Sequence, residues 1–129
     1  MRETILDAIG NTPLVRLNRV NPYGEVQMLA KVEGFNPTGS IKDRIALYMV
    51  NQAEAEGTLR KGKTIIEATS GNTGISLAMI GRVKGYDVEV VMSEAVSVER
   101  RKMIGAFGAK VTLTPKEEGT DLSLIHISE

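Results

Sequence analysis

The 129-residue sequence contains no cysteine and no tryptophan, and it has a single histidine. The absence of cysteine excludes disulfides, thiolate nucleophiles and zinc sites built from cysteine, and one histidine gives little support to a metal centre. A chain without disulfides fits a reducing compartment, so we expect this protein to be cytoplasmic.

Net charge is also lacking, because 16 Lys and Arg residues are balanced by 16 Asp and Glu residues. Nucleic acids and anionic membranes are recognised by clusters of unopposed cations, so we expect neither as a partner. The sequence has no apolar run approaching the ~20 residues of a membrane-spanning helix. Small molecules or other proteins remain as partners.

The first part of the chain predicts two short strands and a helix. The strands are expected at 14–17 and 25–32, joined by a turn at 21–24. A loop at 34–39 containing two glycines and a proline then leads into a helix at 41–56, which Ser40 can cap. The helix is predicted because apolar residues recur at helical spacing, at Ile41, Ile45, Tyr48, Met49 and Ala53, and Gly57 can end it.

Strands and helices then alternate along the chain. Strands are predicted at 64–66, 87–92 and 110–113; helices at about 75–83, mostly buried, and at 97–107, capped by Ser97 and ended by Gly108. This alternation indicates βαβ crossovers, a largely parallel sheet and therefore an α/β fold. Ligands bind such sheets beyond the carboxyl ends of the strands, which directs attention to the loops at 34–39 and 69–74.

Residues 57–64 match the pattern G-x-x-x-x-G-K-[ST] of nucleotide triphosphatases. That loop requires a strand before it and a helix after it, so that the helix N-terminus faces the phosphates. Here the predicted order is reversed, which favours a basic surface turn. A non-catalytic module that binds a nucleotide through this segment remains the alternative hypothesis.

The loop at 69–73 places hydroxyls, an amide and small residues at a predicted helix N-terminus, after a buried strand. Backbone N–H groups and the positive end of the helix dipole converge there, so the loop is suited to bind a carboxylate or a phosphate. A helix cap followed by a turn would use the same residues, and the pattern alone does not separate the two interpretations.

Lys42 lies in the first turn of the helix predicted at 41–56. A cation there opposes the helix dipole, which together with partial burial favours a neutral amine suited to Schiff-base chemistry. The competing interpretation is a solvated lysine paired with Asp43 or Glu33.

Four segments carry a resemblance to a known family. Segments 31–44, 9–17, 67–74 and 97–102 resemble motifs of the cysteine synthase and cystathionine β-synthase family, and 31–44 is similar to its cofactor-attachment motif. The resemblance implies the parallel-sheet βαβ units of a fold-type II pyridoxal-phosphate enzyme, like the tryptophan synthase β subunit.

The resemblance also implies a reaction: synthesis of L-cysteine from O-acetyl-L-serine and sulfide with pyridoxal 5′-phosphate as cofactor. It assigns Lys42 to hold the cofactor and to move the Cα proton, and Asn72 to contact the cofactor's 3′-oxygen. The residues implied to hold the substrate carboxylate are Thr69, Ser70, Gly71, Asn72 and Thr73. Cystathionine synthesis and O-phosphoserine-dependent synthesis are the alternatives within the family, and a homodimer is expected of the full-length protein.

Chains of that family are much longer and supply their cofactor-phosphate loop and pyridine-nitrogen partner later in the sequence. We therefore expect 1–33 to be a hairpin belonging to a larger domain and 34–121 to be a small α/β domain. Residues 122–129 resemble a translated sequencing adapter, the alternative being a genuine C-terminal strand. The 129 residues alone are expected to expose apolar surface and to show no useful turnover.

Overall fold

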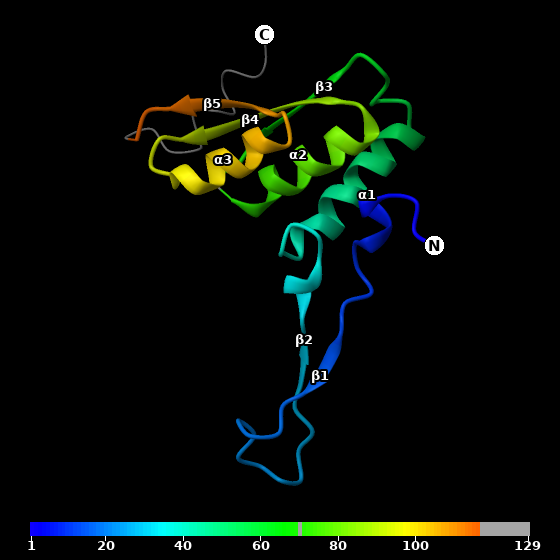
Figure 1. Ribbon diagram of the computed structural model, residues 1–129, viewed down its shortest axis with the longest axis vertical. Coiled ribbons are helices and arrows are strands. Elements are labelled where there is room, and N and C mark those ends of the chain that lie inside the picture. The colour runs from blue at the N-terminus through cyan, green and yellow to red at the C-terminus, as the bar shows by residue number, and fades with distance from the viewer. Residues whose placement is uncertain (70, 117–129) are drawn as a thin grey trace.

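Three parallel strands with helices packed on one side of them form the larger part of the protein (Figure 1). The computed structural model describes residues 1–69 and 71–116. The strands are β3 (Thr64–Ala68), β4 (Asp87–Ser93) and β5 (Lys110–Thr114), hydrogen-bonded in that order and parallel throughout. The predicted α/β fold with a parallel sheet is confirmed, and each strand runs one or two residues beyond its predicted end.

Three α-helices accompany the described strands: α1 (Lys42–Ala55), α2 (Asn72–Lys84) and α3 (Val98–Ala106). Helix α2 packs against β3 and β4, α3 against β5, and α1 against α2. The core lies where the helices and the sheet meet around α2. Helix α2 is apolar nearly all round and is buried from Gly74 to Gly81. The core side chains include Ala46, Val50, Ile75, Leu77, Ile80, Val88, Val90, Met92 and Ile104.

Helices α1 and α2 run side by side in the same direction. Near their first turns, the Ser76 hydroxyl donates to the Asp43 carboxylate at 2.6 Å. Near their last turns, the Tyr86 hydroxyl donates to Glu54 at 2.9 Å, and Lys84 forms an ion pair with the same carboxylate. The N-termini of both helices therefore lie at the same end of the pair.

Before α1, the chain forms a hairpin that projects away from the sheet and helices (Figure 1). Strand β1 (Leu14–Arg16) pairs antiparallel with β2 (Leu29–Lys31), between short 3₁₀ helices at Ile5–Ala8 and Glu33–Phe35. The prediction of a strand over 25–32 is wrong at its start, because the backbone turns where Val26 donates to the Tyr23 carbonyl at 3.1 Å.

The helix predicted over 41–56 is confirmed as α1, but its larger apolar side chains are not the buried ones. Ile45, Tyr48 and Met49 are 45%, 69% and 43% exposed, whereas Asp43, Ala46 and Val50 are buried. Helix α1 packs against α2, so the side of α1 that carries the larger apolar residues stays open to solvent. Three smaller differences concern Ile66 and Val83, which are exposed, and Ser97, whose side chain makes no capping hydrogen bond.

Two predictions fall outside the described residues: the role of Ser70 and the assignment of 122–129 as a non-native tail. Within the part of the chain that the structure describes, no helix combines the length and the apolar character needed to cross a membrane.

Candidate active site

Lys42 is the first residue of α1 and follows a tight turn. Gly39 adopts φ +84°, and its N–H donates to the Asn36 carbonyl at 2.8 Å. The Ser40 hydroxyl then accepts a hydrogen bond from the Lys42 backbone N–H at 3.1 Å, which satisfies one of the free donors at the helix start. The side chain of Lys42 is half-buried at this junction.

The two carboxylates that could have paired with Lys42 are occupied by other groups. Asp43 accepts from Ser76 and Thr38, and Glu33 forms an ion pair with Arg44 at 2.7 Å. Among the residues that the structure describes, the Lys42 amine takes part in no hydrogen bond or ion pair. The interpretation of Lys42 as a lysine paired with Asp43 or Glu33 therefore receives no support.

The loop between β3 and α2 lies at the carboxyl end of β3, as predicted for a ligand-binding position. Thr69 is half-buried; its N–H donates to the Val91 carbonyl at 3.0 Å, and its hydroxyl accepts from the Gly71 N–H at 3.3 Å. Asn72 is exposed as the first residue of α2, and Thr73 is half-buried beside it. The described members of the predicted substrate loop therefore gather around the N-terminus of α2.

The structure brings this loop and Lys42 together through Asp43, whose side chain is 0% exposed. Its carboxylate accepts hydrogen bonds from the Thr38 N–H at 2.8 Å, from the Thr38 hydroxyl and from the Ser76 hydroxyl. Ser76 lies one turn after Asn72 and also donates to the Asn72 carbonyl at 3.0 Å. Both predicted loops, separate in sequence, thus meet at one end of the α1 and α2 pair.

A second polar cluster on the other side of Lys42 was not predicted from the sequence. Arg44 donates to the two Glu33 oxygens at 2.7 and 3.0 Å, and the Thr12 hydroxyl donates to Glu33 at 2.8 Å. Hydrogen bonding to Arg44, and then to Thr12, lowers the pKa of Glu33 to about 2, and Glu33 in turn raises the pKa of Arg44. Each of these residues lies within a segment that carries the family resemblance. Those segments were the only feature of the sequence that could have pointed to this cluster.

This cluster also fixes the 9–17 motif against the lysine turn. The Gly10 N–H donates to the Asn36 side chain at 2.8 Å, and Asn36 donates to Glu33. Gly10 has φ +80°, and a Cβ on it would stand 2.8 Å from Arg44 Nη1. Glycine is required there both for the backbone conformation and for the space taken by the guanidinium.

The 57–64 segment folds as a turn between α1 and β3 and does not form a phosphate cradle. Its side chains bind its own backbone: Arg60 donates to the Gly57 carbonyl at 2.7 Å, and Lys63 donates to the Thr58 carbonyl at 2.9 Å. A helix precedes the turn and a strand follows it, opposite to the arrangement that nucleotide binding requires.

A cavity of about 420 Å³ opens between α1 and β3, away from the two loops. Its lining on α1 starts at Met49, two turns beyond Lys42, and includes Glu67, whose pKa is raised by burial. Its other walls are largely apolar, without the converging donors found near Lys42. The N-termini of α1 and α2 are therefore a better candidate for the active site than this cavity.

Comparisons with known proteins identify the family of the chain. Residues 5–126 match the family described as "Pyridoxal-phosphate dependent enzyme". The chain therefore belongs to the pyridoxal-phosphate dependent enzymes, and its fold is that of the fold-type II members.

The relatives have narrower names, most of them cysteine synthase. A cysteine synthase of Aquifex aeolicus is 51% identical over 131 residues, covering 99% of this chain and 40% of the relative. An O-ureido-L-serine synthase of Streptomyces lavendulae is 52% identical over 91% of this chain and 36% of its own. A crystal structure of cysteine synthase from Entamoeba histolytica superposes with a TM-score of 0.93 at 41% identity, covering 98% and 39% of the two chains. This chain thus spans about 40% of the length of the Aquifex aeolicus and Streptomyces lavendulae relatives.

The residues present fit pyridoxal phosphate in their chemistry. An amine without a partner among the described residues can condense with an aldehyde, and two adjoining helix N-termini offer N–H donors to anionic oxygens. The Arg100 guanidinium lies nearby, because a Cβ on Gly71 would stand 4.0 Å from its Nη1. The described residues can therefore hold the aldehyde end of the cofactor and an anionic substrate group.

Proposed function

We propose that this chain supplies the lysine-bearing part of a cysteine synthase, which makes L-cysteine from O-acetyl-L-serine and sulfide. The observation that carries the proposal is the position of Lys42, an amine without a partner among the described residues, beside the N-terminus of α2. The names of the relatives support the same reaction.

In this proposal Lys42 holds the cofactor through its amine, then takes the proton from the substrate Cα and returns it. Bound pyridoxal phosphate supplies the electron sink that makes this proton removable. Thr69, Ser70, Gly71, Asn72 and Thr73 bind the substrate carboxylate with N–H and side-chain donors, and Asn72 also donates to the cofactor's 3′-oxygen. Because one tethered amine acts as both base and acid, the proton that it removes stays close to the reacting carbon until it is returned.

The test extends the reading frame on the source DNA and expresses the longer protein it encodes. We expect that protein to form cysteine from O-acetyl-L-serine and sulfide, and we expect Lys42→Ala to lower turnover by at least roughly 10³-fold. Lys61→Ala, in the exposed turn after α1, serves as the matched control and should retain turnover. Turnover retained by Lys42→Ala would contradict the role of this lysine.

A second candidate product is O-ureido-L-serine, because a synthase of that name is as similar to this chain as the cysteine synthases are. Cystathionine synthesis and use of O-phosphoserine belong to the same set of alternatives. Mass spectrometry of the products formed by the longer protein with each activated serine and nucleophile separates them. Equilibrium binding of labelled ATP with magnesium tests the remaining alternative, a nucleotide module using 57–64, for which we expect no binding.

The proposal extends to the organisation of the whole protein. Residues 1–33 form a hairpin that would belong to a larger domain, and 34–121 would form the small domain that presents Lys42. The full-length enzyme would work as a homodimer in the cytoplasm, a compartment that suits a chain with no cysteine. Sedimentation of the longer protein tests the dimer.

A further inference from the structure

A buried carboxylate lies between the N-termini of α1 and α2, adjacent in sequence to Lys42. Asp43 is 0% exposed, and its donors come from two segments: Thr38 in the turn before α1 and Ser76 in α2. The Thr38 and Ser76 hydroxyls also lie 3.3 Å apart. The carboxylate therefore joins the lysine turn, α1 and α2 at one point.

Electrostatics favours an acidic side chain at this buried position. Each helix N-terminus carries a partial positive charge, and two parallel helices place these like charges next to each other. A carboxylate between them is attracted to both, and its hydrogen bonds compensate for the loss of water. Asp43 thus favours close approach of two helix ends that would otherwise repel each other.

We propose that Asp43 and Ser76, with Thr38, are positioning residues that set the place of the Lys42 amine relative to the 69–73 loop. This inference rests on the proposed function, in which these two elements handle the same substrate. Lys42 moves with its neighbour Asp43, and Asn72 moves with Ser76, which donates to the Asn72 carbonyl at 3.0 Å. Loss of the Ser76 hydroxyl would let the two elements shift, and reactions are sensitive to shifts of about 1 Å.

The structure offers a matched control at the opposite ends of the same helices. There the Tyr86 hydroxyl donates to Glu54 at 2.9 Å, linking the end of α1 to the segment after α2. Tyr86→Phe removes one side-chain hydrogen bond of the same kind, three helical turns from Lys42. A merely structural brace predicts similar consequences for Tyr86→Phe and Ser76→Ala, whereas a positioning role predicts different ones.

The experiment removes the cofactor from the longer protein, treats it with a limiting amount of pyridoxal phosphate, reduces the product with borohydride and quantifies each modified lysine by mass spectrometry. The readout is the adduct at Lys42 divided by the summed adducts at the other lysines. We expect Ser76→Ala to lower this ratio by roughly tenfold, within the sensitivity of reactions to misplacement. Tyr86→Phe should leave the ratio unchanged, and Ser76→Thr, which keeps the hydroxyl, should restore it.

An unchanged ratio in Ser76→Ala, or an equal loss in Ser76→Ala and Tyr86→Phe, overturns the positioning role. If circular dichroism shows that Ser76→Ala has lost its helices, Thr38→Val removes the other hydroxyl and the same comparison with Tyr86→Phe decides. Cysteine formation by the longer protein is measured separately, so failure of the positioning role is distinguishable from failure of the proposed function.

Discussion

Neighbouring residues at the start of α1 are held by different partners. Asp43 is buried and held by Thr38 and Ser76, whereas Arg44 points to the other side and is held by Glu33. Successive helical residues point about 100° apart, so contacts on both sides of Lys42 fix the first turn in two directions. A lysine that must approach a cofactor and a substrate gains orientation from such support.

The Glu33–Arg44 pair leads to a prediction about acid stability. The pKa of Glu33 falls from 4.5 to about 2 on folding, so its contribution to stability is present above pH 4.5 and is lost as the pH falls towards 2. Glu33→Gln removes that contribution at neutral pH. Urea unfolding measures the free energy of unfolding of the unsubstituted chain and of Glu33→Gln as a function of pH. The two free energies should differ above pH 4.5 and converge towards pH 2. A difference that stays constant with pH would contradict the low pKa of Glu33.

At the scale of elements, the packing of α2 on β4 depends on glycine. A Cβ on Gly81 would stand 2.2 Å from Val88 Cγ2, so Gly81→Ala forces the helix away from the strand. We expect urea unfolding to show a loss of about 1–3 kcal/mol, as for other overpacked cores. Gly105→Ala in α3 is the control: a Cβ there meets nothing within 4 Å and should stabilise by roughly 0.5–1 kcal/mol. Equal effects in the two variants would refute this packing argument.

The elements also show how far the sequence predicts the structure. Strand β4 was predictable because Val88, Val90 and Val91 form a compact β-branched run with an apolar environment on the sheet. The extent of α1 was predictable as well, but its buried side was not, because periodicity does not tell which neighbour a helix will meet. The meeting of the two loops depends on Asp43 and Ser76, 33 positions apart, and no local pattern encodes that pairing.

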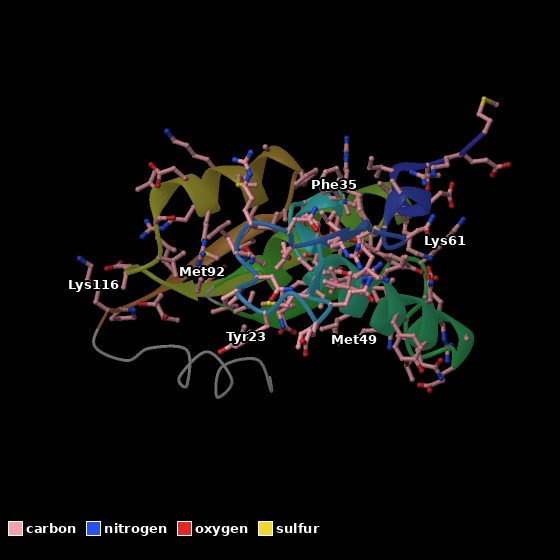
Figure 2. All side chains as sticks on the ribbon, turned by 90° about the horizontal axis from the view of Figure 1, so that it is seen from below. Tyr23, Phe35, Met49, Lys61, Met92 and Lys116 are labelled. Carbon is pink, nitrogen blue, oxygen red and sulfur yellow. The ribbon has the colours of Figure 1, made fainter. Side chains whose placement is uncertain are left out.

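At the scale of the whole molecule, apolar side chains from three separate segments are exposed. Tyr23 in the hairpin, Phe35 after β2 and Met49 in α1 are 67%, 71% and 43% exposed (Figure 2). On α1, Ile45 and Tyr48 extend the same exposed side. Ile45, Tyr48 and Met49 are spaced to lie on one side of α1, and exposed apolar patches can bind other proteins or domains.

The exposed side of α1 should bind apolar molecules. We expect the 129-residue chain to bind a hydrophobic fluorescent dye, and we expect the double variant Ile45→Lys, Met49→Lys to bind it less. Both residues are more than 40% exposed, so the free energy of unfolding should change by less than about 0.5 kcal/mol for each. Val98→Lys, at a 53% exposed position on α3, is the control and should leave dye binding nearly unchanged. An equal decrease in the control would mean that the dye reports general surface charge, whereas a selective decrease would identify the exposed side of α1 as the surface that binds the dye.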